Sequence, residues 1–383
     1  MSWIFQEHHD LFRRSARTFA EREIIPHVDE WEEQETIPRQ VWQRLGELGY
    51  LGIEYDPQYG GAGADFITTL VFFEELARCR AMGLPMAVAA HTDMGSPHLY
   101  YSGSDEQKER LLPAIIRGEK VCAITVSEPG GGSDVAAIQT RARRDGDYYI
   151  LNGSKTFITN GVYGDLYFAA VRTGEAGPGA RHKGISVLMV EKGTPGFIVA
   201  KKLKKMGWWC SDTAELVFEE CPVPAQNLLG IEGEGFHEVM KNFQRERLVT
   251  AVIAVAATQQ ALEDAMAYAR QRIAFDRPIA KFQALRHRFA EMYTEVEAAR
   301  HLTYYVSWLF SRGEASDREV SAAKLLTSEV ANRVAYGALQ VYGGYGYIRE
   351  LPIERFYRDT RVLTIGAGTS EIMKEVIARR LDL

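Results

Sequence analysis

A short glycine turn near the end of the chain has the composition of a ligand-binding helix start but contains no reactive side chain. Residues 366–368 (Gly-Ala-Gly) end an apolar run, and residues 369–371 (Thr-Ser-Glu) open a predicted helix. Backbone N–H groups at a helix start can hold an anion or a polarised carbonyl oxygen. Any reaction here therefore needs an acid, base or nucleophile from elsewhere. The simpler alternative is a C-terminal helix with a flexible entry.

A second glycine-rich stretch, residues 127–134 (SEPGGGSD), follows a predicted strand at residues 121–126. Its three glycines let the backbone approach a ligand closely, and Ser127, Ser133 and free N–H groups can donate hydrogen bonds. It is not a dinucleotide-binding GxGxxG turn, because the β pattern resumes at once and no suitable helix follows. From these residues alone, a ligand loop and a plain tight loop between strands are equally acceptable.

Residues 152–161 (NGSKTFITNG) predict a strand on which Phe157 and Thr159 share one side. This places an aromatic ring beside a hydroxyl group. Such a pair suits stacking on a flat ring and hydrogen bonding to its edge. A plain amphipathic strand is the simpler interpretation of the same pattern.

Two further stretches end predicted helices and can meet a ligand. Residues 270–278 (RQRIAFDRP) carry clustered arginines, which bind a pyrophosphate or simply occupy a helix C-terminus where the dipole favours cations. Residues 340–346 (QVYGGYG) give a glycine-rich helix end that another chain or a ligand can approach closely. Each stretch alone has a structural as well as a functional interpretation.

The overall composition is that of an ordinary globular protein with a large core. The chain has 383 residues, 46% of them hydrophobic, and a formal net charge of -6. This length predicts two or three domains, and the charge argues against binding to nucleic acid. The N-terminus lacks the pattern of a signal peptide, and no apolar run reaches about 18 residues. We therefore expect a cytoplasmic protein that does not enter a membrane.

The cysteines and histidines form no metal-binding or disulfide pattern. The four cysteines include no CxxC pair, which favours a reducing compartment and buried or incidental thiols. The nine histidines are scattered, without HExxH or HxH. A protein-bound metal is not expected.

Hydrophobic periodicity divides the chain into three regions: residues 1–118, 119–230 and 231–383. The first is helical in pattern. The second contains short strands, predicted at residues 121–126, 166–171, 184–190 and 213–218. It also contains a hairpin with Asp145-Gly146 as its turn signal. Many short strands joined by glycine-rich turns predict a small β barrel or sandwich.

The third region contains long amphipathic helices, predicted at residues 244–272, 283–311 and 317–342, and a shorter one at residues 369–380. Four helices of this kind form an antiparallel bundle. The order predicts an α+β protein. It has an N-terminal all-α domain, a middle β-barrel or sandwich domain and a C-terminal four-helix bundle.

Taken together and in this order, five stretches resemble motifs of the acyl-CoA dehydrogenase family: SEPGGGSD, KTFITNG, RIAFDRPIAKFQ, QVYGGYGY and GTSEI. The resemblance covers essentially the whole chain and agrees with the α–β–α order. It implies a homotetrameric enzyme that binds FAD and oxidises acyl-CoA thioesters to 2-enoyl-CoAs. It also implies that the electrons pass to electron-transferring flavoprotein.

The resemblance implies one group of FAD contacts around the flavin ring. Ser127 and its neighbours would contact the isoalloxazine, and Ser133 would touch both FAD and the acyl-CoA. Phe157 and Thr159 would pack on the ring and bond to its N5 edge. The remaining expected contacts of this group are Ile124, Val126, Gly132, Ile158, Thr369 and Glu371.

A second group of FAD contacts is implied at the other motifs. Arg272, Phe275 and Gln283 would reach the FAD of a neighbouring subunit. The helix end at residues 340–344 would line the adenosine and pyrophosphate part. Its expected contacts are Gln340, Val341, Gly343 and Gly344.

The resemblance also says which residue supplies the missing base. Most of the family has Tyr-Glu-Gly-Thr at the final turn, and that Glu removes the substrate α-proton; here Ala367 stands in its place. A minority branch, similar to isovaleryl-CoA, long-chain and citronellyl-CoA dehydrogenases, carries the base at the start of the first long C-terminal helix. This chain has Glu246 there. Without the resemblance, Glu246 is a solvated charge between two arginines. The expected substrate contacts are Ser133, Gln244, Arg247, Gly366, Ala367 and Gly368.

A carboxylate base needs a pKa of about 6–7, which burial against flavin and acyl chain would supply. Small residues at positions 366 and 367 free volume beside the reacting carbons and favour a branched or longer acyl-CoA.

Two alternatives of the same fold are an acyl-CoA oxidase and a flavin-bearing scaffold without dehydrogenase activity. Trp208 and Trp209 depart from the family pattern, where an arginine often stands second. They either shape the pocket or simply pack.

Overall fold

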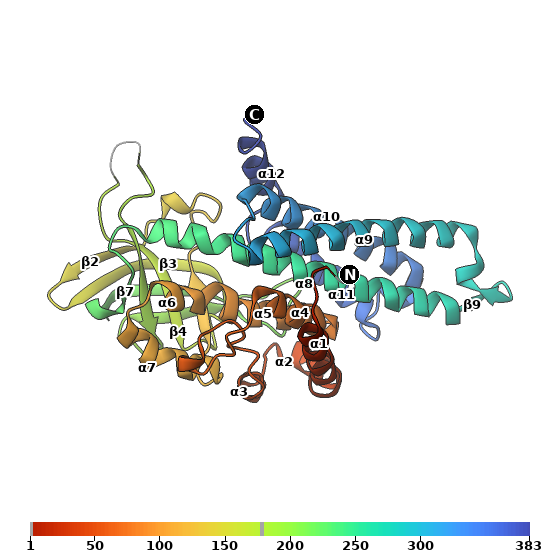
Figure 1. The fold of residues 1–383 in the computed structure, drawn as a ribbon, viewed down its shortest axis with the longest axis horizontal. Coiled ribbons are helices and arrows are strands. Elements are labelled where there is room, and N and C mark those ends of the chain that lie inside the picture. Colours follow the sequence, from red (N-terminus) through yellow and green to blue (C-terminus); the bar gives the residue numbers. More distant parts are fainter. Residues whose placement is uncertain (1–2, 177–179) are drawn as a thin grey trace.

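In chain order, helical segments precede and follow a β region. Figure 1 shows the strands of this region at the left end of the molecule, with the long helices extending to the right. The computed structural model describes residues 3–176 and 180–383. The predicted α+β class is confirmed: a helical N-terminal domain, a middle domain built on a sheet and a helical C-terminal domain. Within the described ranges, every helix is too short or too polar to cross a membrane.

The N-terminal helices share a hydrophobic core with the first long helix of the C-terminal domain, α8. They are α1 (Glu7–Phe19), α2 (Val28–Gln34), α3 (Arg39–Glu47), α4 (Phe66–Leu76), α5 (Gly83–Ala89), α6 (Ser96–Ser102) and α7 (Asp105–Ile116). Every residue of α4 is buried because this helix contacts α1, α8 and α9. Its two acids, Glu74 and Glu75, are compensated by Arg13 on α1. A helix without a solvent face is apolar nearly all round, as this one is.

A π-helical segment, η5 (Ala90–Gly95), joins α5 to α6. It packs against strand β1 and against α8. π-helical turns are rare and occur frequently at functional sites. In this chain the segment lies where the N-terminal helices approach the beginning of α8.

Eight strands form one mixed sheet in the order β6-β7-β3-β2-β4-β5-β8, with β1 added in parallel to β4. They are β1 (Cys122–Thr125), β2 (Arg141–Asp145), β3 (Tyr148–Thr159), β4 (Leu166–Arg172), β5 (Ile185–Glu191), β6 (Phe197–Lys202), β7 (Thr213–Pro224) and β8 (Leu228–Leu229). β2 and β3 form the predicted hairpin, and Gly146 supplies the positive φ of its turn. Periodicity does not predict β6, an edge strand whose side chains are half-buried or exposed.

Three long helices form most of the C-terminal domain: α8 (Gly235–Gln271), α9 (Gln283–Ser311) and α10 (Asp317–Tyr342). The bounds of α9 and α10 are those predicted. The prediction that the first long helix starts at Gln244 is wrong, because α8 begins at Gly235. Its first turns pack Phe236, Val239 and Met240 on the core of the β domain. These residues therefore do not continue the stripe that faces the other helices.

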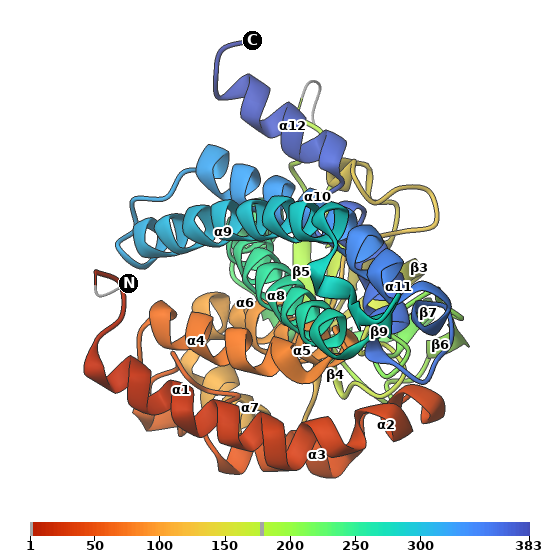
Figure 2. The ribbon, with the colours of Figure 1, turned by 90° about the vertical axis from the view of Figure 1, so that its right-hand side faces the viewer.

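The chain ends with α11 (Pro352–Thr360) and α12 (Ser370–Arg379). α12 packs on α10 and otherwise points away from the rest of the molecule (Figures 1 and 2). A small hairpin of β9 (Ile273–Ala274) and β10 (Arg277–Pro278) connects α8 to α9. It lies at the end of α8 that is remote from the sheet (Figure 1). One long helix thus runs from the β domain to the opposite end of the molecule.

A charged contact joins the N-terminal helices to the β domain. Arg39 at the start of α3 donates to both carboxylate oxygens of Asp165, at 2.6 and 2.5 Å. The same carboxylate accepts the Val121 N–H at 2.7 Å, beside the start of β1. Hydrogen bonds to charged groups are worth more than neutral ones, so Asp165 fixes the entry to β1.

We expect Asp165→Ala to lower the free energy of unfolding by about 1–3 kcal/mol, because it removes a charged acceptor from both Arg39 and the Val121 N–H. Urea unfolding monitored by circular dichroism measures the change. Glu119→Ala is the matched control, since it removes one exposed partner of Arg117 and should change stability little. Equal losses in the two variants would contradict the structural role of Asp165.

Candidate active site

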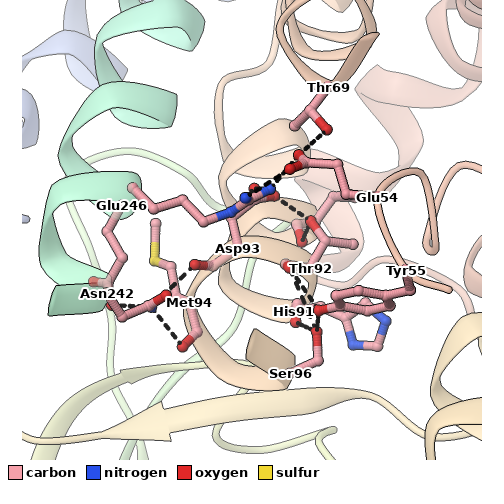
Figure 3. Close-up of polar contacts among 12 residues, drawn as sticks. Glu54, Tyr55, Thr69, His91, Thr92, Asp93, Met94, Ser96, Asn242 and Glu246 are labelled. Carbon is pink, nitrogen blue, oxygen red and sulfur yellow. Dashed lines mark hydrogen bonds and ion pairs between the residues drawn. The ribbon is translucent and has the colours of Figure 1, made fainter. Parts of the chain in front are cut away.

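Glu246 on α8 is a buried carboxyl group with one side-chain hydrogen bond. The residue is 6% exposed, and Asn242, one turn earlier, donates to its Oε1 at 2.8 Å (Figure 3). No cation of the described chain pairs with it within 4 Å. Burial raises its pKa to about 8, against the Asn242 hydrogen bond and the charge of Arg247, and the charge of Asp93 raises it further. Glu246 is therefore not the solvated charge that its two flanking arginines allow.

Asn242 ties this carboxyl group to the N-terminal domain. Its Nδ2 lies 3.1 Å from the carbonyl oxygen of Asp93 and 3.3 Å from that of Met94, both in η5 (Figure 3). A side-chain amide has two N–H groups for these carbonyls and the carboxyl oxygen. The same amide thus orients Glu246 and holds the beginning of α8 against η5.

The glycine turn before α12 is held by a buried lysine. Lys324 on α10 is buried and donates to the carbonyl oxygens of Leu363, at 2.8 Å, and Gly368. Burial lowers the pKa of Lys324 to about 8. Ala367 and Gly368 adopt positive φ values of 52° and 90°. A non-glycine residue in this region is strained and persists only where the surroundings fix it.

The turn leaves polar groups free to meet a ligand. Within the described part of the chain, the N–H groups of Ala367 and Gly368 donate no hydrogen bond. The buried atoms Gln244 Oε1 and Arg247 Nε also have no partner there. A Cβ placed on Gly368 would lie 3.8 Å from Arg247 Nε, so the arginine and the turn are neighbours. Buried polar atoms without partners are rare and indicate an absent polar ligand or water.

Beyond the turn, Thr369 accepts the Ile372 N–H at 3.2 Å as the N-cap of α12, and Glu371 is exposed in its first turn. Both residues therefore have ordinary helix-capping positions in addition to the predicted contact with FAD.

The glycine-rich loop after β1 is anchored to β3 by a buried ion pair. Lys155 donates to Glu128 at 2.9 Å and to the Val126 carbonyl at 3.0 Å. Glu128 also accepts the N–H groups of Gln139 and Thr140. These bonds hold the loop beside the strand that carries Phe157.

Within this loop, Ser127 is half-buried and its carbonyl accepts the Thr156 N–H at 3.0 Å. Ser133 is exposed, and a Cβ on Gly132 would approach only the Ser127 hydroxyl, at 3.5 Å. The loop is therefore open on its outer side, where backbone and serine groups remain accessible.

Phe157 presents its ring on the surface although most phenylalanines are buried. It is 71% exposed and has a φ of 60°. Thr159 is half-buried two residues on, whereas Ile158 between them is 2% exposed and lies in the core of the β domain. Ile124 is half-buried and Val126 is buried nearby. Phe157 and Thr159 therefore face outward, while the expected contact at Ile158 is a core position.

The second group of predicted contacts lies at the other end of α8. Phe275, in the β9–β10 hairpin, is 88% exposed and has a φ of 51°. Figure 1 places this hairpin far from the sheet that carries Phe157. Gln283 is the first residue of α9, and Arg272 follows the last residue of α8. One chain therefore presents two separate groups of contacts rather than one continuous site.

A cavity of about 520 Å³ adjoins this second group. It is lined by Arg272 and by the end of α10, including Val341, Gly343 and Gly344. Nothing of the described chain lies within 4 Å of a Cβ placed on either glycine, and Gln340 is exposed beside them. A basic residue beside open glycine backbone fits a diphosphate, as the exposed Phe157 ring fits a flat ring system. The chain thus carries groups that fit FAD at both places.

Trp208 and Trp209, which depart from the family pattern, pack against α11. Trp209 lies under two guanidinium groups, those of Arg349 at 4.4 Å and Arg358 at 3.7 Å from its ring centre. The Trp208 N–H donates to Asp359 on α11 at 2.7 Å. Packing and the two guanidinium contacts account for the Trp209 indole. The indole nitrogen of Trp208 is buried and has no hydrogen-bond partner among the described residues, so a role of Trp208 in shaping a pocket stays a prediction.

Sequence reasoning does not identify the groups that support these sites: Asn242, Lys324, Glu128 and Lys155. The i, i+4 spacing of Asn242 and Glu246 on a predicted helix is a readable signal for one of them. Lys324 lies in an ordinary amphipathic helix. Its hydrogen-bond acceptor Leu363 is 39 residues further along the chain, and nothing in the sequence relates the two residues.

Sequence models of the three acyl-CoA dehydrogenase domains match the chain. The N-terminal domain matches residues 6–119, the middle domain residues 123–221 and the C-terminal domain residues 233–382. An acyl-CoA dehydrogenase of Bacillus subtilis is 40% identical over 371 residues, 97% of each chain. The mitochondrial long-chain specific acyl-CoA dehydrogenase of Mus musculus is 40% identical over 99% of this chain and 87% of its own. The crystal structure of an acyl-CoA dehydrogenase from Geobacillus kaustophilus has a TM-score of 0.96 and 43% identity, with 100% of both chains covered.

The raised pKa of Glu246 predicts a pH-dependent stability difference. Its folded value of about 8 exceeds the unfolded value of 4.5, so the neutral form is favoured by folding, and this stabilisation is lost as pH rises through about 8. Glu246→Gln is neutral at every pH. We expect its melting temperature relative to wild type to rise steadily from pH 5 and to level off above pH 8, as measured by calorimetry. A pH-independent difference would contradict burial of an unpaired carboxyl group.

Lys324→Met should loosen the glycine turn, because the carbonyl groups of Leu363 and Gly368 lose their shared donor. We expect a loss of about 1–3 kcal/mol in the free energy of unfolding. Hydrogen exchange should increase selectively near residues 363–372. Lys374→Met, on the exposed face of α12, is the control and should change neither quantity. Unchanged exchange near the turn in Lys324→Met would refute the anchor.

Proposed function

This chain belongs to the acyl-CoA dehydrogenase family, whose members are FAD-dependent, and from that premise we propose that Glu246 is the base of its reaction. The reaction is the α,β-dehydrogenation of an acyl-CoA thioester to a 2-enoyl-CoA. Glu246 accepts the α-proton of the thioester. FAD, when bound, supplies the acceptor for the hydride that leaves the β-carbon.

The observation that carries this proposal is the state of the Glu246 carboxyl group. It is buried, has one neutral hydrogen-bond donor and is raised in pKa to about 8. A general base is most effective when its pKa lies near the working pH. The value is somewhat above the 6–7 expected from the sequence, and a carboxyl with a strong cationic partner would have been a poorer base. Ala367 in the final turn has no group that competes for this role.

The glycine turn and its neighbours would hold the thioester carbonyl. An α-proton becomes removable when preorganised donors polarise the adjacent carbonyl oxygen. The unpaired N–H groups of Ala367 and Gly368 are donors of this kind, and Lys324 fixes the turn that carries them. Gln244 and Arg247 supply further polar atoms for the substrate.

We further propose that each FAD site is shared between two copies of the chain. Ser127, Ser133, Phe157 and Thr159 would contact the flavin and acyl-CoA of their own subunit. The remote hairpin with Phe275 would reach the FAD of a neighbour. The support is the separation of the two groups along α8 (Figure 1). A homotetramer, as the family resemblance implies, meets this requirement.

Branched or longer acyl-CoAs are the proposed substrates, with electron-transferring flavoprotein as the proposed acceptor. Small residues at positions 366 and 367 support the branched or longer substrates, because they free volume in the turn that would hold the thioester. The long-chain specific mouse relative points the same way. A cytoplasmic location stays part of this proposal.

Anaerobic mixing of the purified holoenzyme with a panel of acyl-CoAs tests the base and the substrate class. Flavin bleaching should be rapid in wild type with branched or long substrates. We expect Glu246→Gln to slow it by roughly 10²–10⁴-fold, the usual contribution of general base catalysis. Glu263→Gln, on the same helix and paired with Arg78, is the control and should bleach at the wild-type rate.

The remaining outcomes separate the alternatives. Bleaching that survives Glu246→Gln would place the base elsewhere. Steady turnover in air without an added acceptor would favour an acyl-CoA oxidase. No bleaching with any acyl-CoA, despite bound FAD, would favour a flavin-bearing scaffold.

A further inference from the structure

A buried cluster of three charges lies directly behind Glu246. Arg245, the preceding residue on α8, donates through Nε to Asp93 Oδ1 at 2.7 Å. It also donates to both oxygens of Glu54, at 2.6 and 3.1 Å. Figure 3 shows the carboxyl groups of Asp93 and Glu54 converging from the N-terminal domain. Thr69 on α4 donates to Glu54 at 2.5 Å and completes the cluster.

This cluster has more negative than positive charge. Two carboxylates face one guanidinium, so the net charge is -1 when all three are ionised. The Asp93 side chain is 1% exposed and the Arg245 side chain is largely buried. Charges in such surroundings are weakly screened, so an excess charge acts on nearby titrating groups.

The two carboxyl groups differ in their relation to Glu246. Asp93 is in η5, and its backbone carbonyl shares Asn242 with the Glu246 carboxyl. The charge of Asp93 acts on the pKa of Glu246 directly. Glu54 accepts from the terminal nitrogens of the Arg245 guanidinium. Its charge is not among the causes of the raised pKa of Glu246.

The other charges around Glu246 are few. Arg247 on α8 opposes Asp93 by favouring the carboxylate. Lys324 on α10 is close enough to Arg247 that, in addition to burial, the charge of Arg247 lowers the pKa of Lys324. From η5 only Asp93 acts on Glu246. Burial is the main cause of the raised pKa of Glu246, and on top of it Arg247 and Asp93 act in opposite directions.

We propose that Asp93, held in place by Arg245, is a positioning residue that sets the pH at which Glu246 becomes a competent base. Glu54 completes the charge pairing of Arg245 but does not tune the base. This inference rests on the proposed role of Glu246 in the reaction. The same η5 segment that tethers Asn242 thereby carries the charge that controls proton transfer.

A purely structural cluster makes a different prediction. Asp93 and Glu54 bind the same guanidinium, and both tie the N-terminal domain to α8. If they serve only this purpose, neutralising either one changes stability while the pH dependence of catalysis stays as in wild type. The pair therefore provides a matched test within one cluster.

The experiment compares Asp93→Asn with Glu54→Gln in the holoenzyme. Each substitution removes one negative charge and leaves Arg245 one carboxylate partner. We measure the rate of anaerobic flavin bleaching by acyl-CoA from pH 5 to 9. We expect the acid limb of the Asp93→Asn profile to move to lower pH by on the order of half a unit or more, because a like charge no longer opposes ionisation. The Glu54→Gln profile should keep the wild-type limb.

A second readout does not depend on turnover. The difference in melting temperature between wild type and Glu246→Gln changes over the pH range in which Glu246 ionises. Introducing Asp93→Asn into wild type and into Glu246→Gln should move this pH range downward. Introducing Glu54→Gln into the same two proteins should leave the range unchanged. Equal shifts for the two substitutions, or no shift with Asp93→Asn, would overturn the inference.

Arg245→Gln gives an independent test if Asp93→Asn does not fold. Burial raises the pKa of Asp93 and the charge of Arg245 opposes that rise, so removing the cation favours a neutral Asp93, and the acid limb should move to lower pH, as with Asp93→Asn. A shift to higher pH, or none, would count against the inference. If Glu246→Gln bleaches at the wild-type rate, the proposed base itself is wrong. If Glu246→Gln is inactive but the acid limb of the pH profile is the same in Asp93→Asn as in wild type, Glu246 remains the base and only the role of Asp93 is wrong.

Discussion

The removal of the Glu246 carboxyl group from water is the constraint on which the site depends. An ionised carboxylate in a buried position without a cation is costly, so the proton is held to about pH 8. This state requires three elements at once: α8 supplies the residue, η5 closes over it, and Asn242 satisfies one oxygen without adding charge. A change in the packing of η5 on α8 therefore changes the chemistry as well as the stability.

Buried lysines fix the two glycine-rich loops of the proposed site. Lys155 holds the SEPGGGSD loop through Glu128, and Lys324 holds the final glycine turn through two carbonyl groups. Burial lowers the pKa of each to about 8, so their hydrogen bonds must compensate for lost hydration. Glycine-rich loops have little intrinsic order. Anchoring them from the rigid elements below gives exposed N–H groups in defined positions, as catalysis by preorganised donors requires.

The exposed rings of Phe157 and Phe275 express a further constraint. Each is a large apolar side chain held outward on backbone with positive φ, an arrangement that is unfavourable unless something covers it. The 37 residues of α8 separate the two places. The length of this helix thus separates the two rings within one chain, and the proposed sharing of the FAD site between subunits rests on this separation.

The sequence by itself determined the α–β–α order, the bounds of α9 and α10, and the motifs of the acyl-CoA dehydrogenase family. These depend on local periodicity and on residue types at fixed spacing. It also pointed to Glu246, because Ala367 stands where another base is usual. Periodicity did not give the true start of α8, since Phe236 and Val239 pack on a different core. Nor did it give the partners of Glu246, Lys324 and Arg245. Those contacts join residues far apart in the chain, and burial and charge at one point depend on all the elements that meet there. Only the tertiary structure therefore decided the proton affinity of Glu246.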